Sequence, residues 1–301
     1  MVYKSVCELC DNLSIEYKIF EKTTKLVSIQ VGGTASLVVY PKTINQFVRI
    51  LDVVLLRKHK HYILGNGTNT YFSDKNFNGI LIVTKRINKC YVDNEQLIAE
   101  CGTLLFDCCE LALKNSLSGM EFAYGIPATI GGALYMNASA FGSSISTVVK
   151  KTLVYDTSLF KTYYIFDDEH LFEEKKSVFS DKKHLIVLET VFELKRGLKF
   201  NIESLMNTYL TKRISTQPLE FPSAGSVFKK PKNNHASQLI DLAGLKGTRV
   251  GGAEVSKKHA GFIINVGEAK ANDIQSLISI IKERIYNEFK VKLEEEIIFV
   301  E

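Results

Sequence analysis

The chain has 301 residues, of which 46% are hydrophobic and 24% are charged, and its formal net charge is +5. This composition is typical of a globular protein long enough for two domains, and it excludes disordered and fibrous classes. The mild positive charge allows an anionic substrate but is too diffuse to indicate nucleic-acid binding, and no apolar run approaches the roughly 18 residues of a membrane span.

The N-terminal residues and the cysteines bear on the cellular compartment. The first twenty residues lack a basic start followed by an apolar core, so we expect no secretory signal. All six cysteines lie within the first 110 residues, and Cys7 and Cys10 form the only CxxC pair. A redox CxxC would normally follow a strand of a thioredoxin-like unit, and no second pair stands at zinc spacing. Reduced thiols in a cytoplasmic protein are the favoured interpretation.

Hydrophobic periodicity predicts both helices and strands in the first two thirds of the chain. Helices are expected over 3–13, 43–58 and 104–116. Strands are expected over 17–29, 36–40, 62–64, 80–83, 89–92, 97–101, 150–156, 161–166 and 185–194, with 89–92 paired to 97–101. Residues 172–180 are expected to form a solvated loop that enters a strand.

The last hundred residues are predicted to contain a helix over 201–213, a long amphipathic helix and a closing strand over 296–300. Asn272 and Asp273 are placed to cap the long helix. Its apolar stripe comprises Ile274, Leu277, Ile278, Ile281, Ile285 and Phe289. The mixed order of elements predicts an α+β fold, with a lead-in over 1–24, one domain over 25–197 and a second over 198–301.

A loop rich in glycine, Gly65-Asn66-Gly67-Thr68-Asn69, directly follows a predicted strand. Such a loop can turn several backbone amides toward a phosphate. It is not a GxGxxG motif, because Thr70 stands in place of the third glycine, and no GK[ST] follows as in a Walker loop. A plain turn between strands is the alternative interpretation.

Small residues also crowd the segment 125–142, which contains four glycines and four alanines. A segment with so few side chains loses much backbone entropy on folding and packs poorly by itself. A ligand lying against the backbone is the usual compensation, so we expect ligand contact here.

The stretch 222–231 leaves its backbone open beside Ser226, because Ala224 and Gly225 carry almost no side chain. Lys229 and Lys230 follow and could hold an anion by charge. An ordinary turn is the alternative. No metal site is expected, because His259 stands far from other ligands, and no serine lies in a GxSxG motif.

Taken in order, these stretches resemble the UDP-N-acetylenolpyruvoylglucosamine reductase family, also called UDP-N-acetylmuramate dehydrogenases. The resemblance runs from about Val31 to the C-terminus, and its motifs together are highly specific. They are VGGTA at 31–35, LGNGTN at 64–69, SGMEFAYGIPATIGGA at 118–133, MNA at 136–138, QPLEFPSAGSVFK at 217–229, LKG at 245–247, GGAEVSKKH at 251–259 and FIIN at 262–265.

The resemblance implies an FAD-binding domain of the vanillyl-alcohol-oxidase type, followed by a smaller substrate domain. It implies that FAD is bound non-covalently, that NADPH is the hydride donor, and that no membrane, nucleic acid or protein partner takes part. The chain is similar to the shorter type of the family, which lacks a substrate-clasping insertion. The residues implied to bind FAD are Gly65, Asn66, Gly67, Thr68, Asn69, Gly125, Ile126, Pro127, Ala128, Thr129, Gly131 and Gly132.

The implied reaction belongs to peptidoglycan precursor synthesis and has two halves. NADPH reduces the flavin and leaves, and the reduced flavin then passes a hydride to C3 of the enolpyruvyl ether of UDP-N-acetylglucosamine. By the family motif, Ser226 donates the proton to C2, Glu296 is the catalytic glutamate, and Lys229 and Lys230 contact the substrate. Residue types alone leave open which of the acids at 294–296 points inward.

The chain departs from the family pattern at a few positions. Lys175 stands where an arginine is expected, with Lys176 as an alternative occupant, and Lys230 replaces an asparagine. Gln30 replaces a common basic residue, and Ala128 a usual glycine. Lysine keeps the charge of arginine but loses its planar, two-pronged grip on a carboxylate. Two alternatives follow: a weakened relative that only binds FAD or a UDP-sugar, or another oxidoreductase of the same FAD fold.

Overall fold

The computed structural model describes residues 2–232 and 234–301, and the chain divides into two compact units. Unit 1 comprises Met1–Ile19, Leu37–Asn66 and Gly79–Lys212, and unit 2 comprises Phe20–Ser36, Gly67–Asn78 and Arg213–Glu301. Each unit therefore gathers segments that lie far apart in the sequence. The functional division at residues 24 and 197 stays a prediction. Within the described residues, no helix has the length and apolar character needed to cross a membrane.

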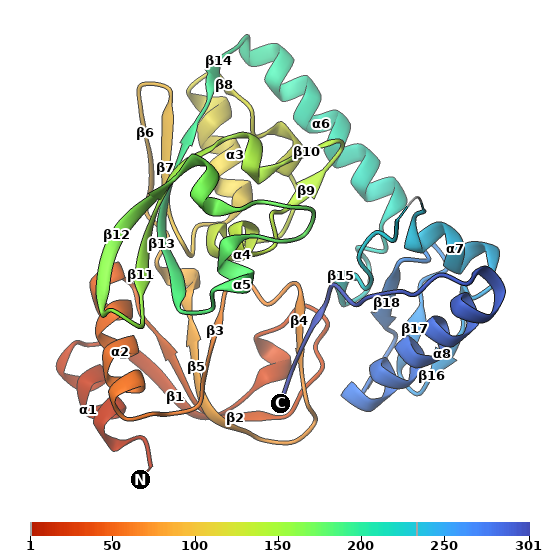
Figure 1. The fold of residues 1–301 in the computed structure, drawn as a ribbon, viewed down its shortest axis with the longest axis horizontal. Coiled ribbons are helices and arrows are strands. Elements are labelled where there is room, and N and C mark those ends of the chain that lie inside the picture. Colours follow the sequence, from red (N-terminus) through yellow and green to blue (C-terminus); the bar gives the residue numbers. More distant parts are fainter. Residues whose placement is uncertain (1, 233) are drawn as a thin grey trace. The chain divides into compact units, whose positions relative to one another are not determined.

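One sheet, formed largely by unit 1, has the strand order β1-β2-β5-β3. Its strands are β1 (Glu16–Lys22), β2 (Thr34–Tyr40), β5 (Phe77–Val83) and β3 (His61–Leu64). Helices α1 (Lys4–Asn12) and α2 (Ile44–Leu56) pack against each other (Figure 1). Thr43 caps α2 by accepting a hydrogen bond from the Gln46 amide. Strand β3 runs parallel to β5 and ends at Leu64, so the glycine-rich loop that begins at Gly65 follows it directly.

The second sheet of unit 1 is antiparallel and has the order β12-β11-β13-β7-β6. Its strands are β6 (Cys90–Asp93), β7 (Gln96–Glu100), β11 (Val149–Asp156), β12 (Lys161–Phe166) and β13 (Leu185–Glu193). Helices α3 (Leu105–Lys114) and α4 (Ile130–Tyr135) contact β7, and α5 (Val178–Asp181) contacts β13. The predicted pairing of 89–92 with 97–101 is confirmed, since Cys90 lies opposite Ala99.

Two short strand pairs complete unit 1. They are β8 (Leu117–Ser118) with β14 (Lys195–Arg196), and β9 (Ser139–Ala140) with β10 (Ser143–Ser144). Helix α6 (Lys199–Thr216) follows, and the division between the units falls inside it, after Lys212.

Unit 2 is built on an antiparallel sheet with the order β15-β18-β17-β16. Its strands are β15 (Ser223–Ser226), β16 (Arg249–Val250), β17 (Ala253–Val255) and β18 (Phe262–Asn265). Helix α8 (Ala271–Phe289) packs on β16 and β17 and contacts α7 (Ala236–Leu242), as Figure 1 shows. The predicted stripe of α8 is buried from Ile274 to Ile285. A separate pair joins β4 (Thr70–Phe72) in parallel to β19 (Ile298–Val300).

Two predicted strands are wrong in part. The strand expected over 17–29 ends at Lys22, because Thr23 donates both its amide and its hydroxyl to the Gly33 carbonyl and turns the chain into a short 3-10 helix. Val27 and Ile29 are still buried, so their alternation marks an irregular buried segment. The closing strand begins at Ile298 rather than at residue 296.

The interpretations of 172–180 and of the start of α8 are also wrong in part. Val178 and Phe179 are buried, but they lie in the short helix α5, whose N-cap is Ser177. Helix α8 begins after Lys270, so Asn272 lies inside its first turn. Asp273 does serve the cap, because its carboxylate accepts the Lys270 amide at 2.9 Å.

Unit 1 contains a buried histidine, His170, whose two ring nitrogens both have hydrogen-bond partners. His170 is fully buried, and its ring nitrogens lie 2.8 Å from the Asp167 carbonyl and 2.9 Å from the Thr152 hydroxyl. The carbonyl can only accept, so Nδ1 carries the hydrogen and Nε2 accepts from the hydroxyl. Burial lowers the pKa of His170, which keeps the ring neutral.

We expect His170 to make the fold sensitive to acid. In the unfolded chain, the His170 ring binds a proton as the pH falls through about 6.5, whereas in the folded protein it stays neutral at that pH. The free energy of unfolding therefore falls as the pH drops below that value. Thermal unfolding at pH 7.5 and pH 5.0 should show a drop in melting temperature about 3 °C larger for the natural chain than for His170→Gln. The exposed His184, changed to Gln, is the control and should keep the natural pH dependence.

Candidate functional site

In unit 1, the structure brings Gly65 and Asn66 against the segment 125–132. The Asn66 side chain donates to the Pro127 carbonyl at 2.7 Å. Gly65 lies so close to Thr129 that a Cβ at Gly65 would overlap the threonine hydroxyl. Two stretches that are sixty residues apart therefore meet through backbone and small side chains, as the predicted cofactor segment requires.

The segment 128–131 is held in place by the turn that joins β7 to α3. The Leu105 amide donates to the Ala128 carbonyl at 2.9 Å, and the Ile130 amide donates to the Thr103 carbonyl at 2.8 Å. The Gly131 amide donates to the Cys101 carbonyl at 2.8 Å. These three bonds fix the backbone on both sides of Thr129, whose hydroxyl accepts the Gly132 amide at 3.4 Å and caps α4.

One amide in this segment stays available. Thr129 is 1% exposed, and its backbone amide donates to no acceptor among the described residues. A buried residue whose amide has no protein partner is uncommon and points to a bound group or water. Gly125 and Ile126 form the turn before the segment, with Gly125 at φ +83° and the Ile126 amide bonded to the Ala123 carbonyl.

In unit 2, Gly67 continues the same loop and is tied to Ser28. The Gly67 carbonyl accepts the Ser28 amide at 2.9 Å and lies 3.3 Å from the Ser28 hydroxyl. That hydroxyl also donates to the Ser223 carbonyl at 2.5 Å. The amide of Gly67, a buried residue, again has no acceptor among the described residues. The Gly67 amide is thus open to a ligand, while hydrogen bonding to Ser28 holds the Gly67 carbonyl in place.

Ser28 is a residue that the sequence interpretation missed. It joins the glycine loop to β15, the strand that carries Ser226, and it lies three residues before Val31, the first residue of the VGG motif. The only signal was that nearness, because a serine in an irregular segment has no periodicity to mark it. Ser28 also lines a hollow of about 500 Å³ in unit 2, together with Lys25, Gln30 and Asn265.

Ser226 ends β15 opposite Phe262 of β18. The register shifts within β15, where Gly225 takes φ +77°, and a Cβ added at Gly225 would lie 3.9 Å from the Thr68 carbonyl oxygen. The Ser226 side chain is exposed, and its hydroxyl makes no hydrogen bond with the described residues. A serine with these properties is free to donate its proton to a ligand.

Glu296 is attached to the same place by its backbone. Its amide donates to the carbonyl of Val227, the residue after Ser226, at 2.7 Å. Its carbonyl accepts the Asn69 side chain at 3.0 Å, and the Asn69 carbonyl accepts the Ile298 amide at 2.9 Å. Of the three terminal acids, Glu296 is half-buried, while Glu294 and Glu295 are exposed. The structure therefore places the loop residue Asn69, Ser226 and Glu296 together in unit 2.

The two lysines after Ser226 differ in their surroundings. Lys229 pairs with Glu294, with its ammonium 3.4 Å from the carboxylate and its amide 2.9 Å from the Glu294 carbonyl. Lys230 is exposed and forms no ion pair with the described residues. An exposed pair contributes little stability, so either ammonium can turn toward an anionic ligand at small cost.

Lys175 lies in unit 1, at a corner of the turn from Glu173 to Lys176. Its backbone takes φ +56°, which a lysine seldom adopts. The neighbouring Lys176 places its ammonium 3.0 Å from Asp181, and this hydrogen bond raises the pKa of Lys176. Lys176 is thus held by an acid that lies five residues after it in the sequence.

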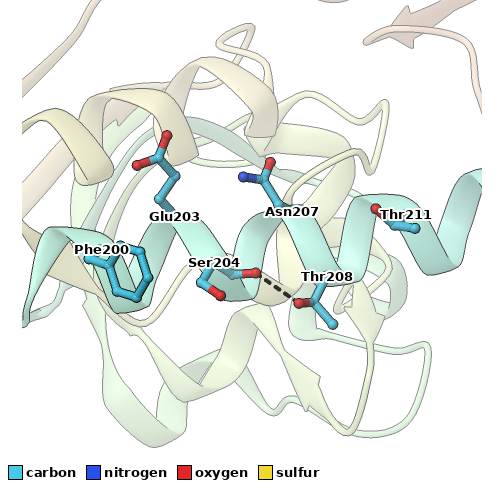
Figure 2. A pocket seen from close by; sticks show the side chains of 6 residues that line it. All are labelled: Phe200, Glu203, Ser204, Asn207, Thr208 and Thr211. Atoms are coloured by element: carbon cyan, nitrogen blue, oxygen red, sulfur yellow. Dashed lines mark hydrogen bonds between the residues drawn. The ribbon is translucent and has the colours of Figure 1, made fainter.

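A hollow on helix α6 and the thiols of Cys7 and Cys10 do not offer a competing site. The hollow has a volume of about 540 Å³, and its six lining side chains, labelled in Figure 2, all come from α6. They are Phe200, Glu203, Ser204, Asn207, Thr208 and Thr211. A shallow face of one helix brings no charges together from different elements. Cys7 and Cys10 are buried, and burial raises the pKa of Cys10 to about 12, opposite to a reactive thiol.

Comparison with known proteins connects these features. A family model described as an FAD binding domain matches residues 35–158, and one described as UDP-N-acetylenolpyruvoylglucosamine reductase, C-terminal domain, matches residues 217–300. A protein named UDP-N-acetylenolpyruvoylglucosamine reductase from Thermosipho melanesiensis is 41% identical, over 95% of this chain and 96% of its own. One of the same name from Caldicellulosiruptor bescii is 39% identical, over 96% of this chain and 92% of its own.

The chain belongs to the UDP-N-acetylenolpyruvoylglucosamine reductase family. The crystal structure of the Thermus caldophilus reductase agrees, with 28% identity, a TM-score of 0.77 and coverage of 95% of this chain and 99% of that one. The predicted α+β fold, with an FAD-binding domain followed by the C-terminal domain of this reductase family, is confirmed.

The residues present fit an FAD. In unit 1, the Thr129 amide is open for a phosphate oxygen, and a Cβ at Gly65 would fill space beside Thr129. Neither 65–69 nor 125–132 contains an acidic residue that would repel a pyrophosphate. Among the described residues no cluster of His, Cys, Asp and Glu could hold a metal ion. The individual cofactor and catalytic assignments stay predictions.

We expect the substitution Gly67→Ala to lower the free energy of unfolding of unit 2. The residue takes φ +65°, and a Cβ there would overlap the Leu26 carbonyl, so the loop would have to move away from Ser28. The loss should be more than about 2 kcal/mol in urea unfolding. Gly142→Ala is the matched control, because Gly142 takes φ +85° with no atom within 4 Å of its Cβ position. Equal losses in the two variants would show that the backbone angle alone matters.

Proposed function

We propose that this chain reduces the enolpyruvyl ether of UDP-N-acetylglucosamine to UDP-N-acetylmuramate, with NADPH as the reductant. The reaction is a step of peptidoglycan precursor synthesis, and we assign it to the cytoplasm, where NADPH and nucleotide sugars are found. The observation that carries the proposal is the open Ser226 hydroxyl beside Val227, whose carbonyl holds Glu296. Membership of the reductase family supports it.

Non-covalent FAD would be held by the loop 65–69 and the segment 125–132, and when bound it supplies the hydride for C3 of the enolpyruvyl group. The assigned residues are Gly65, Asn66, Gly67, Thr68, Asn69, Gly125, Ile126, Pro127, Ala128, Thr129, Gly131 and Gly132. Support comes from the contact of Asn66 with Pro127 and from the open amides at Gly67 and Thr129.

The protein's own task is to manage the charge and the proton that C2 needs. Addition at C3 leaves negative charge at C2 and in the adjoining carboxylate. We assign Ser226 to donate its Oγ proton to C2, and Lys175 to hold the carboxylate by charge. Lys229 and Lys230 are assigned to the anionic parts of the substrate. Glu296 is assigned as the second catalytic residue, placed by its backbone bonds to Val227 and Asn69.

Replacing Ser226 tests the proposal directly. In Ser226→Ala, anaerobic reduction of the flavin by NADPH should keep its natural rate, because no proton at C2 is involved. Reoxidation of the reduced flavin by the enolpyruvyl sugar should slow by ~10³-fold, within the range for general acids. Stopped-flow absorbance of the flavin measures both halves.

The control for this experiment is Ser223→Ala, because Ser223 begins the same strand and contributes its carbonyl rather than its side chain to the framework. It should reoxidise at the natural rate. Loss of both half-reactions in Ser226→Ala would make the serine structural. Natural reoxidation in Ser226→Ala, with loss in Glu296→Gln, would assign the proton to the glutamate instead. A protein that binds FAD but is not reoxidised by the sugar in its natural form would be a weakened relative.

The lysine in place of arginine gives a second test. Lys175→Arg restores a planar fork that can grip a carboxylate at two points, so kcat/KM for the enolpyruvyl sugar should rise about fivefold. Lys176→Arg should leave it unchanged, because residue 176 stays paired with Asp181. A rise in Lys176→Arg alone would show that Lys176 occupies the arginine position.

A further inference from the structure

The turn that carries Lys175 is closed by two backbone hydrogen bonds. The Glu173 amide donates to the Lys176 carbonyl at 3.1 Å, and the Lys176 amide donates to the Glu173 carbonyl at 3.3 Å. Glu174 and Lys175 occupy the two corners, and only residues 173–176 belong to the turn. An isolated turn of this size on a protein surface would fluctuate, so its attachment decides where Lys175 points.

Asn137 attaches the first end of this turn to the neighbouring backbone. Its side-chain amide donates to the Glu173 carbonyl at 2.8 Å, and its side-chain oxygen accepts the Ser146 amide at 3.3 Å. Asn137 is 7% exposed and takes φ +41°. Both ends of its carboxamide are therefore occupied inside unit 1, which holds the carboxamide in one orientation.

Ser177 attaches the second end. Its side chain is fully buried, and its hydroxyl donates to the Tyr135 carbonyl at 3.0 Å. Tyr135 is the last residue of α4, which begins directly after Thr129. Asn137 follows α4 by two residues, so both attachments of the Lys175 turn come from the chain that continues the predicted FAD segment.

We propose that Asn137 is a positioning residue that acts through Lys175. The proposal rests on the proposed function, in which Lys175 holds the substrate carboxylate. A lysine ammonium is a point charge on a flexible stem and lacks the geometric selectivity of a guanidinium. Its placement therefore depends on the backbone from which it extends, and the bond from Asn137 to Glu173 fixes that backbone. Here the framework supplies part of the precision that an arginine would carry in its own side chain.

The test compares Asn137→Gly with Asn94→Gly. Glycine tolerates the positive φ at both positions, and Asn94 takes φ +56° in an exposed turn of the same unit. The first readout is trypsin cleavage after Lys175 and Lys176 in the folded protein, followed by mass spectrometry. Asn137→Gly should raise the cleavage rate about tenfold, because local opening controls proteolysis, and Asn94→Gly should not change it. Unchanged cleavage in Asn137→Gly would overturn the proposal that Asn137 holds the turn 173–176 in place.

The second readout is a double-mutant cycle with Lys175→Met, measured on reoxidation of the reduced flavin by the enolpyruvyl sugar. Asn137→Gly should slow this step about tenfold in the natural background and less than twofold beside Lys175→Met, because Asn137 acts through the lysine. Equal losses in both backgrounds would overturn the proposal alone, leaving Asn137 structural. Natural reoxidation in Lys175→Met would instead overturn the role of Lys175 in the proposed function, and the proposal with it.

Asn137→Asp is a second variant in case the glycine variant does not fold. The carboxylate keeps the size of the side chain and still accepts the Ser146 amide, but it cannot donate to the Glu173 carbonyl. It should reproduce both the faster cleavage and the loss that depends on Lys175. Natural behaviour in Asn137→Asp by both readouts would contradict the proposal.

Discussion

The hydrogen bonds between Ser28 and the carbonyls of Gly67 and Ser223 are the constraint on which the site in unit 2 depends. The hydroxyl has one proton and donates it to Ser223 at 2.5 Å, while the amide of Ser28 serves Gly67 at 2.9 Å. One residue thus links the glycine loop to the strand that ends at Ser226. Because Gly67 packs against the Leu26 carbonyl, this link leaves no room for a side chain at residue 67.

Close packing within the protein, as well as a bound ligand, explains why small residues occupy the loop 65–69 and the segment 125–142. Gly65 lies against Thr129, and the Gly131 amide is bonded to the Cys101 carbonyl at 2.8 Å. Part of the entropy that these glycines lose is therefore offset by close backbone packing within the protein itself. The ligand remains favoured where amides stay open, at Gly67 and Thr129, rather than along the whole segment.

The charged side chains near the candidate residues are held loosely. The pairs Lys229–Glu294 and Lys176–Asp181 are exposed, and exposed pairs are worth little in stability. The Glu294 carboxylate competes with an anionic ligand for Lys229, whereas Lys230 has no ion-pair partner within the described residues. Lys230 therefore contributes a positive charge that no carboxylate of the described residues neutralises.

The sequence by itself determined the family, the α+β class and most elements, because ordered motifs and hydrophobic periodicity are properties of the chain. The helix over 43–58 and the stripe from Ile274 to Ile285 depend on burial of one face, which periodicity predicts. Ser226 and Glu296 could be named from motifs, although spacing left the choice among the terminal acids open. Only the tertiary structure joined Glu296 to Val227 and Asn69, and only it showed the hydrogen bonds of Ser28 to Gly67 and Ser223 and of Asn137 to Glu173. Such bonds run between segments distant in sequence, and a single polar side chain that makes one leaves no periodic signal, so the chain alone cannot reveal them.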